Sequence, residues 1–221
     1  MSVITLSRQY GSGGDEIADT ISAITGFRLF DKHILSRAAF EAGLSEQEVV
    51  DLSEDQYKAQ SFFDRLFGRS RPIAQVRHTE ELQLTEEQAL AFVQKAILTA
   101  HKIGNIIIIG RGGQVILKDY PDVLHVRVEA PLEDRILRVR SYPEIAHRSF
   151  SDSVEARRAA QDLIEKSDSA SIDYLKRFYN VDWSDPMLYH LVINTGKLSI
   201  QQSAWLIVET ARQILQKSEP V

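Results

Sequence analysis

The sequence contains no cysteine. A chain without cysteine can form no disulfide, no cysteine-ligated zinc or iron–sulfur site and no thiol nucleophile. Its six histidines show neither HxxxH nor HExxH spacing, the patterns that place two metal ligands on one helix face. We therefore expect no transition-metal site built from protein side chains, and we assign no residue as a metal ligand.

Basic residues and long apolar runs are also few. Lysine and arginine number 26 against 31 aspartate and glutamate, which gives a formal net charge of −5. This balance argues against a broad basic surface for nucleic acid, so an anionic ligand must be held by local positive groups.

No segment reaches the roughly 18 uninterrupted apolar residues of a membrane span, and the apolar start is too short for a secretory signal. We expect a cytoplasmic protein that binds neither nucleic acid nor membrane.

The 221 residues suit one α/β domain, since 43% are hydrophobic and 26% are charged, as in ordinary soluble proteins. Strand and helix patterns alternate along the chain, with strands expected at 2–7, 106–109, 123–128 and 188–193 and a short apolar run at 27–30. The clearest helices are expected at 15–25, at 85–103, from Pro131 and from about Ile200. Capping patterns predict further helices from Asp31 to about Ala42 and after Ser45, and an amphipathic helix falls within 57–80. The alternation predicts a doubly wound parallel sheet with its ligand at the carboxyl ends of the strands.

A glycine-rich loop, residues 7–14, lies between the first expected strand and the first expected helix. Such a loop directs successive backbone N–H groups to one point, where the helix dipole also favours negative charge, so it suits a phosphate. Neither standard motif fits. The dinucleotide pattern GxGxxG fails at Glu16, and GxxxxGK[ST] would need Gly at Arg8, Lys at Gly14 and Ser or Thr at Asp15. An ordinary strand-to-helix turn is therefore the alternative.

Four blocks of sequence follow one another along the chain. They are ITLSRQYGSGG (4–14) with Ile17-Ala18, FDKHIL (30–35), IIGRGG (108–113) followed by Val126 to Arg135, and KSD (166–168) with Tyr174, leading to DWSDPMLYHLVINT (182–195). Together these blocks make the chain resemble the cytidylate kinase-like family, a branch of the P-loop nucleoside monophosphate kinases. They span most of residues 3–195 in the order found in the family.

The resemblance implies a three-layer α/β/α fold of P-loop NTPase type, with a helical lid and a helical substrate-binding insert on a parallel sheet. It implies one kinase-like domain over residues 1–221, with its core at 1–30, 85–130 and 186–217, the insert at 31–84 and the lid at about 131–185. It also implies an enzyme that uses ATP and Mg²⁺ to phosphorylate CMP or a similar pyrimidine monophosphate. Nucleotides are then its expected partners, and the protein is expected to be a monomer or homodimer.

The resemblance also implies roles for individual residues. Those expected to hold the cofactor are Arg8, Gly11, Ser12, Gly13, Gly14 and Asp15, and those expected at the substrate are Asp31, Lys32, Arg111 and Asp168. Arg111 would grip the acceptor phosphate, because a guanidinium offers it two parallel N–H donors. Arg135 and Arg138, on one helical face, would lean toward the transferring group, so these three arginines are the expected catalytic residues.

Each assignment has a structural alternative. Asp31 could serve only as a helix N-cap, and Arg111 only as a partner in a structural ion pair. Arg135 and Arg138 could form a solvated helix face, and Asp168 could be a surface acid or a hinge cap.

The chain departs from the family pattern at the chemical centre. Gly14 replaces the loop lysine and is followed by the acidic Asp15, Gly112 replaces an aspartate, and Ser171 lies where a lid arginine is expected. Asp15 is either tolerated at the helix start or helps to hold Mg²⁺. Two alternatives to a nucleotide kinase follow, namely a nucleotide-binding pseudokinase or sensor and a small-molecule kinase of the same fold. The missing cation could come from Arg8, Lys32, Arg138, Arg140 or Arg148.

Overall fold

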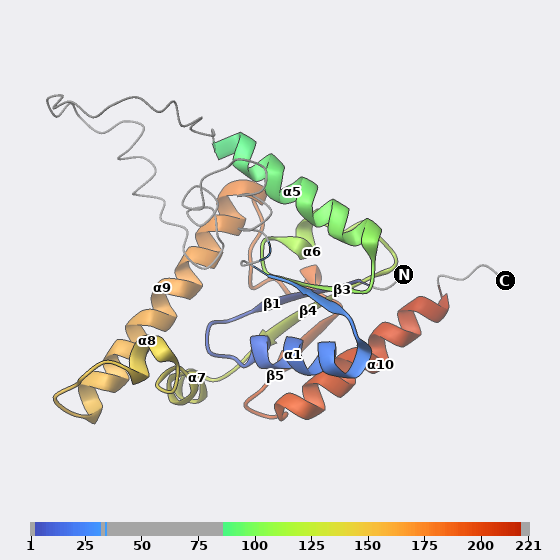
Figure 1. Cartoon of the computed structure of the whole chain (residues 1–221). Helices are drawn as coiled ribbons and strands as arrows, with labels where there is room; N and C mark the ends of the chain where they lie inside the picture. The colour runs from blue at the N-terminus through green and yellow to red at the C-terminus, as the bar shows by residue number, and fades with distance from the viewer. Residues whose placement is uncertain (1–2, 32–33, 35–85, 218–221) are drawn as a thin grey trace, which may run out of the picture.

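The computed structural model describes residues 3–31, 34 and 86–217 (Figure 1). In chain order its elements are β1 (Val3–Arg8), α1 (Gly14–Thr25), β2 (Arg28–Phe30), α5 (Glu86–Ile103), β3 (Ile106–Ile109), α6 (Gly113–Ile116), β4 (Val123–Glu129), α7 (Leu132–Val139), α8 (Pro143–Ala146), α9 (Ser153–Tyr179), η1 (Pro186–Leu188), β5 (Leu191–Asn194) and α10 (Ile200–Lys217). The helices expected at 31–42, after Ser45 and within 57–80 lie outside the described residues, apart from Asp31 and Ile34. Lys32 lies outside them too.

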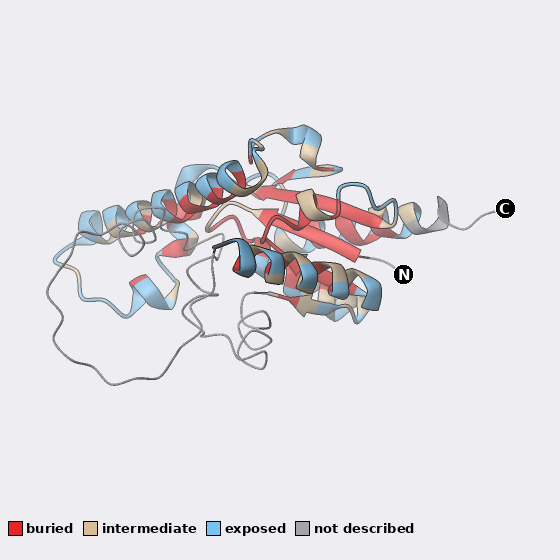
Figure 2. Ribbon diagram, turned by 90° about the horizontal axis from the view of Figure 1, so that it is seen from above, coloured by how far each residue is buried: buried red, intermediate tan, exposed pale blue. Residues whose placement is uncertain are grey.

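The five strands form one parallel sheet in the order β2-β3-β1-β4-β5. Helices α1 and α10 pack on one face of the sheet, and α5 and α6 pack on the other. Figure 2 shows the strands buried between these helices. The predicted three-layer α/β/α architecture is therefore confirmed, and β1 lies at the centre of the sheet.

The run of four isoleucines in β3 shows why the sequence predicted a doubly covered strand. Ile107 and Ile109 belong to the core beneath α1 and α10, whereas Ile106 and Ile108 belong to the core beneath α5. All four are buried, because alternate side chains of a strand point to opposite faces and both faces are covered.

Two elements differ from the sequence expectation. β5 begins at Leu191 instead of residue 188, because Pro186 starts the turn η1 and the Asp185 carboxylate accepts a hydrogen bond from the Met187 N–H at 2.9 Å. The 27-residue helix α9 lies within the range for which the resemblance implied a helical lid, but its bounds were not predicted. Together with α7 and α8 it occupies the range assigned to the lid, and Figure 1 shows these helices extending beyond the sheet. Within the described ranges, no helix combines the length and the apolar character needed to cross a membrane.

A buried histidine, His125, lies on β4 beside the central strand β1. His125 is 4% exposed, and its Nδ1 lies 2.8 Å from the hydroxyl of Thr5, its register partner on β1. The ring of His190 stacks on it at 5.1 Å between centroids. Burial, and secondly the charge of His190, lower the pKa of His125 to about 4. The neutral imidazole is therefore the form that suits the folded state.

Because the pKa of His125 is lowered in the folded state, we expect the free energy of unfolding to fall in acid. The unfolded chain takes up a proton at His125 near pH 6.5, whereas the folded chain resists protonation until about pH 4, so stability present at pH 7 is lost as the pH falls through that window. We expect this group alone to lower the free energy of unfolding by about 2 kcal/mol between pH 7 and pH 5. Urea unfolding at the two pH values measures it. His125→Asn should reduce the difference in unfolding free energy between the two pH values, whereas the control His147→Asn, at an exposed histidine, should leave it unchanged. An equal pH dependence in the wild type and both variants would contradict the role of His125.

Candidate active site

The glycine loop joins the end of β1 to the start of α1, as the sequence predicted. Gly11 has φ +77° and Gly13 has φ +84°, left-handed conformations that glycine adopts without strain. Gly13 is also the N-cap of α1, with no side chain capping the helix. Backbone N–H groups at such a helix start form a site for phosphate or another anion.

A pocket opens at this loop. Its described lining is Arg8, Gln9, Tyr10, Gly11, Gly13, Gly14, Asp15, Tyr142, Ser167, Asp168 and Ser171. Five of the six residues expected to hold the cofactor therefore lie together, and the sixth, Ser12, is buried beneath them. Asp168 and Ser171 come from α9, so the long helix whose bounds were not predicted forms one wall of the site.

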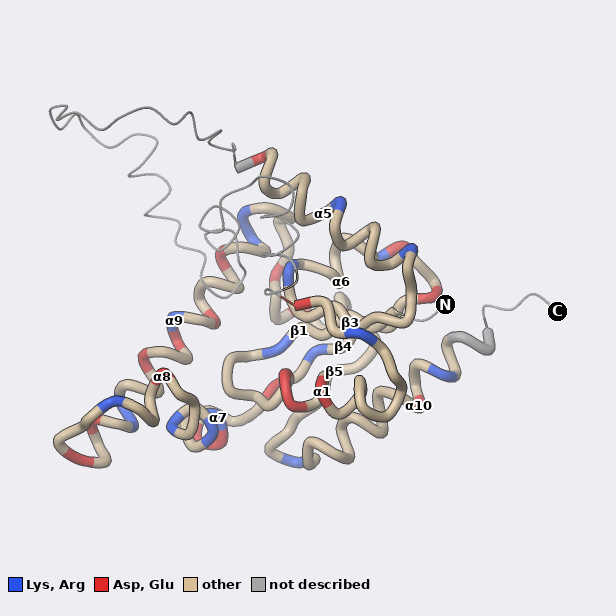
Figure 3. Tube along the Cα trace, viewed as in Figure 1, with Lys and Arg blue, Asp and Glu red and all other residues tan. Residues whose placement is uncertain are grey.

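Charges of both signs flank the loop. Figure 3 shows a basic residue at the end of β1 and acidic residues at the start of α1. Nε of Arg8 lies 3.1 Å from Oδ1 of Asp15, whose side chain is 67% exposed. Burial, followed by the carboxylates of Glu16 and Asp15, raises the pKa of Tyr142. The Tyr142 hydroxyl therefore stays protonated and neutral at the pocket wall.

Arg138 holds the loop from its outer side. Its Nη1 donates to the Gly11 carbonyl at 3.2 Å and to Oγ1 of Thr195 at 3.2 Å. The Thr195 hydroxyl in turn donates to the Ser12 carbonyl at 2.6 Å. Helix α7 and the residue after β5 thus fix two successive carbonyl groups of the loop.

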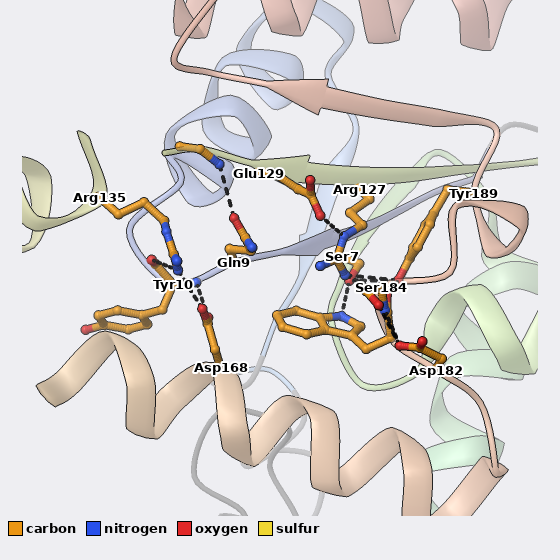
Figure 4. Close-up of polar contacts among 12 residues, drawn as sticks. Ser7, Gln9, Tyr10, Arg127, Glu129, Arg135, Asp168, Asp182, Ser184 and Tyr189 are labelled. Carbon is orange, nitrogen blue, oxygen red and sulfur yellow. Dashed lines mark hydrogen bonds and ion pairs between the residues drawn. The ribbon is translucent and has the colours of Figure 1, made fainter. Parts of the chain in front are cut away.

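Arg135 and Asp168 form a second support, shown in Figure 4. Arg135 Nη1 donates to Asp168 Oδ2 at 2.5 Å and to the Tyr10 carbonyl at 3.4 Å, while the Tyr10 N–H donates to Asp168 Oδ1 at 2.9 Å. Both charged side chains are largely buried, with 10% and 17% of their surface exposed. The pair connects α7, α9 and the loop, three segments that are far apart in the sequence.

Arg111 lies in the turn after β3, next to the strand that feeds the loop. The turn is joined to β1 by a hydrogen bond from the Gly110 N–H to the Leu6 carbonyl, at 3.0 Å. Arg111 is 2% exposed and has φ +62°, a conformation that is uncommon for an arginine and that clusters at functional sites. At Gly112, which has φ +71°, a Cβ would lie 2.8 Å from the Tyr179 ring, so glycine suits this position, at which the resemblance expects an aspartate.

Asp31 makes one described contact that its structural alternative, a helix N-cap, would also make. Its Oδ1 accepts a hydrogen bond from the Ile34 N–H at 3.1 Å, the spacing of a helix N-cap. Asp31 and Arg111 are both outside the described pocket lining. Whether Asp31 also contacts a nucleoside therefore stays a prediction.

A buried network that the sequence did not reveal anchors the segment after α9. Arg127 is 2% exposed; its Nη1 donates to the Trp183 carbonyl at 2.7 Å, and its guanidinium lies 4.2 Å from the centroid of the Trp183 ring. Nε1 of Trp183 donates to the hydroxyl of Ser7 at 2.7 Å (Figure 4). This network fixes the DWSDP block against the strand residue that precedes Arg8. The only sequence signal was the block itself, because no periodicity marks a partner 56 residues away.

The comparisons with known proteins agree with this geometry. The sequence model of the cytidylate kinase-like family matches residues 3–197. A cytidylate kinase of Methanopyrus kandleri is 28% identical over 221 residues, covering 99% of this chain and 97% of that protein, and one of Sulfurisphaera tokodaii is 27% identical over 206 residues, covering 93% and 92%.

Solved structures show the same fold. An uncharacterized protein from Eubacterium ventriosum superposes with a TM-score of 0.63 at 17% identity, covering 96% of this chain and 99% of that one. A gluconokinase from Sinorhizobium meliloti superposes with a TM-score of 0.50 at 8% identity, covering 99% and 98%. At these identities the likeness establishes the architecture alone.

Proposed function

The chain belongs to the cytidylate kinase-like family, and from this premise we propose that it transfers the γ-phosphoryl group of ATP to CMP or a similar pyrimidine nucleoside monophosphate. The observation that carries the proposal is the pocket in which the glycine loop faces α9. Its backbone N–H groups at the start of α1 suit the donor phosphates, and the supports from α7 hold those groups in place.

The residues present fit a nucleotide with Mg²⁺. The positive φ angles of Gly11 and Gly13 leave the loop backbone open to phosphate oxygens. Mg²⁺ binds through one or two carboxylates together with phosphate oxygens and water, and the lining contains the carboxylate of Asp168. Bound Mg²⁺ supplies neutralisation of the charge on the phosphoryl oxygens. No three of the described His, Asp or Glu side chains gather into a metal site, as suits an ion held mainly by its substrate.

Positioning is the main task of the protein in phosphoryl transfer. We assign Arg111 to the acceptor phosphate, because its turn is bonded to β1 beside the loop and its guanidinium can bind two phosphate oxygens at once. Arg135 and Arg138 contact loop carbonyls, and these contacts support a positioning role. Their direct contact with the transferring group stays a prediction.

The test is an ADP-release assay with Mg²⁺-ATP and CMP, dCMP, UMP, AMP or GMP as acceptor, combined with calorimetric titration of ATP. We expect the highest kcat/KM with CMP or dCMP.

A second candidate is a nucleotide-binding pseudokinase. The ion pair between Arg8 and Asp15 favours it, because the Asp15 carboxylate neutralises a guanidinium that could otherwise bind phosphate. That candidate predicts ATP binding without ADP release for any acceptor. No binding of ATP would overturn both.

A further inference from the structure

The three positions at which the loop departs from GxxxxGK[ST] are in contact with one another. That motif needs glycine at position 8, lysine at 14 and a hydroxyl at 15, whereas the chain has Arg8, Gly14 and Asp15. A Cβ built on Gly14 would lie 2.6 Å from Cβ and 2.7 Å from Cγ of Arg8. The guanidinium Nε then reaches Asp15, at 3.1 Å. One spatial arrangement thus accounts for all three departures.

We propose that Arg8 supplies the phosphate-binding cation of the loop in place of a lysine at position 14, and that Asp15 holds its guanidinium until nucleotide phosphate displaces the carboxylate. Compared with GxxxxGK[ST], the basic residue stands at position 8 instead of 14, and the glycine stands at 14 instead of 8. Side chains at 8 and 14 would compete for one space, so a loop can carry its cation at either position but not at both. This role rests on the proposed function, because it assumes a nucleotide at the loop.

The remaining cations of the site support the assignment. Arg138 donates to the Gly11 carbonyl and Arg135 donates to Asp168, so both guanidinium groups are engaged in contacts that support the loop. Among the described lining residues, Arg8 is the one basic side chain. It is largely buried, with 17% of its side chain exposed, and it lines the pocket together with Asp15.

The resting partner is suited to displacement. Asp15 is 67% exposed, and a pair with one exposed member is weakened by solvent and salt. A polyphosphate carries several negative charges and accepts two parallel hydrogen bonds from a guanidinium, whereas the described contact with Asp15 joins Nε to one carboxylate oxygen. Nucleotide binding would therefore exchange one carboxylate contact for a stronger phosphate contact.

The experiment compares five variants with the wild type by calorimetric titration of Mg²⁺-ATP, a readout that needs no acceptor. Arg8→Met keeps the packed stem and removes the charge, and we expect it to weaken ATP binding at least about tenfold. Gly14→Lys should also weaken binding, because its side chain collides with Arg8. Arg8→Gly/Gly14→Lys restores the glycine at 8 and the lysine at 14 of the standard motif and should bind at least about tenfold more tightly than Gly14→Lys. Asp15→Asn should tighten binding about threefold. Exposed Arg28→Ala, on β2, is the charge-matched control and should bind as the wild type does.

The outcomes separate this role from the proposed function. ATP binding by Arg8→Met within twofold of the wild type would overturn the role of Arg8, whatever the acceptor. A double variant no better than Gly14→Lys would overturn the exchange of positions. If the wild type binds ATP and depends on Arg8 but phosphorylates no nucleoside monophosphate, the role of Arg8 stands and the proposed function fails. No ATP binding by the wild type overturns both.

Discussion

Asp168→Ala is expected to lower kcat/KM for phosphoryl transfer about a hundredfold, chiefly through a lower kcat and a higher KM for ATP. One carboxylate accepts from both the Tyr10 N–H and the Arg135 guanidinium, so its removal releases the loop and leaves a largely buried arginine without this partner. Hydrogen bonds to charged groups contribute about 1.5–3 kcal/mol, and 2.7 kcal/mol corresponds to a hundredfold in rate. Steady-state kinetics with ATP varied at saturating acceptor measures the effect.

Two further variants divide this effect into its parts. Asp168→Asn keeps an oxygen that can accept from the Tyr10 N–H but loses the charge opposite Arg135, so we expect an intermediate loss of about tenfold. Asp162→Asn removes an exposed carboxylate two turns earlier on α9 and should change neither kcat nor KM. If Asp168→Ala lowers the melting temperature but keeps kcat/KM within twofold of the wild type, the carboxylate supports the lid helices and not the reaction.

The sheet and the position of the loop could be predicted because their signals are local. The isoleucines of β3 are consecutive, and the glycines of the loop come directly between a strand and a helix. Helix α9 has no comparable signal. It buries only part of its surface, through small or polar residues such as Ala160, Ser167 and Ser171 as well as larger ones, so its apolar stripe is thin.

The contacts of the site residues could not be predicted, because they join distant segments. Asp168 was expected at the substrate, yet its partner Arg135 lies 33 residues earlier and on another helix. Gly14 was interpreted as a missing cation, and only the structure shows that the stem of Arg8 fills the space beside it. Periodicity reports which face of an element is buried, but it contains no information about which side chain lies opposite.

Arg111→Ala is expected to raise the KM for the acceptor nucleotide and to lower kcat, with a combined loss of about a hundredfold in kcat/KM. Arg111 is buried at the end of β3 with φ +62°, a conformation that costs energy and is kept where the surroundings require it. A clamp on the acceptor phosphate binds the ground state and also orients the attacking oxygen, so both kinetic constants change. Loss of a charge-assisted bidentate pair accounts for the size of the effect.

Matched variants distinguish this role from a purely structural one. Arg111→Lys keeps the charge without the planar fork and should recover about tenfold of the loss. Asn105→Ala changes a second non-glycine residue beside β3 that is left-handed, at φ +51°, and should lower stability without changing the KM for the acceptor. Varying the acceptor should show the defect of Arg111→Ala while the KM for ATP stays near that of the wild type, the reverse of the Asp168→Ala pattern. Unchanged acceptor kinetics with a lower melting temperature would show that Arg111 holds only the turn.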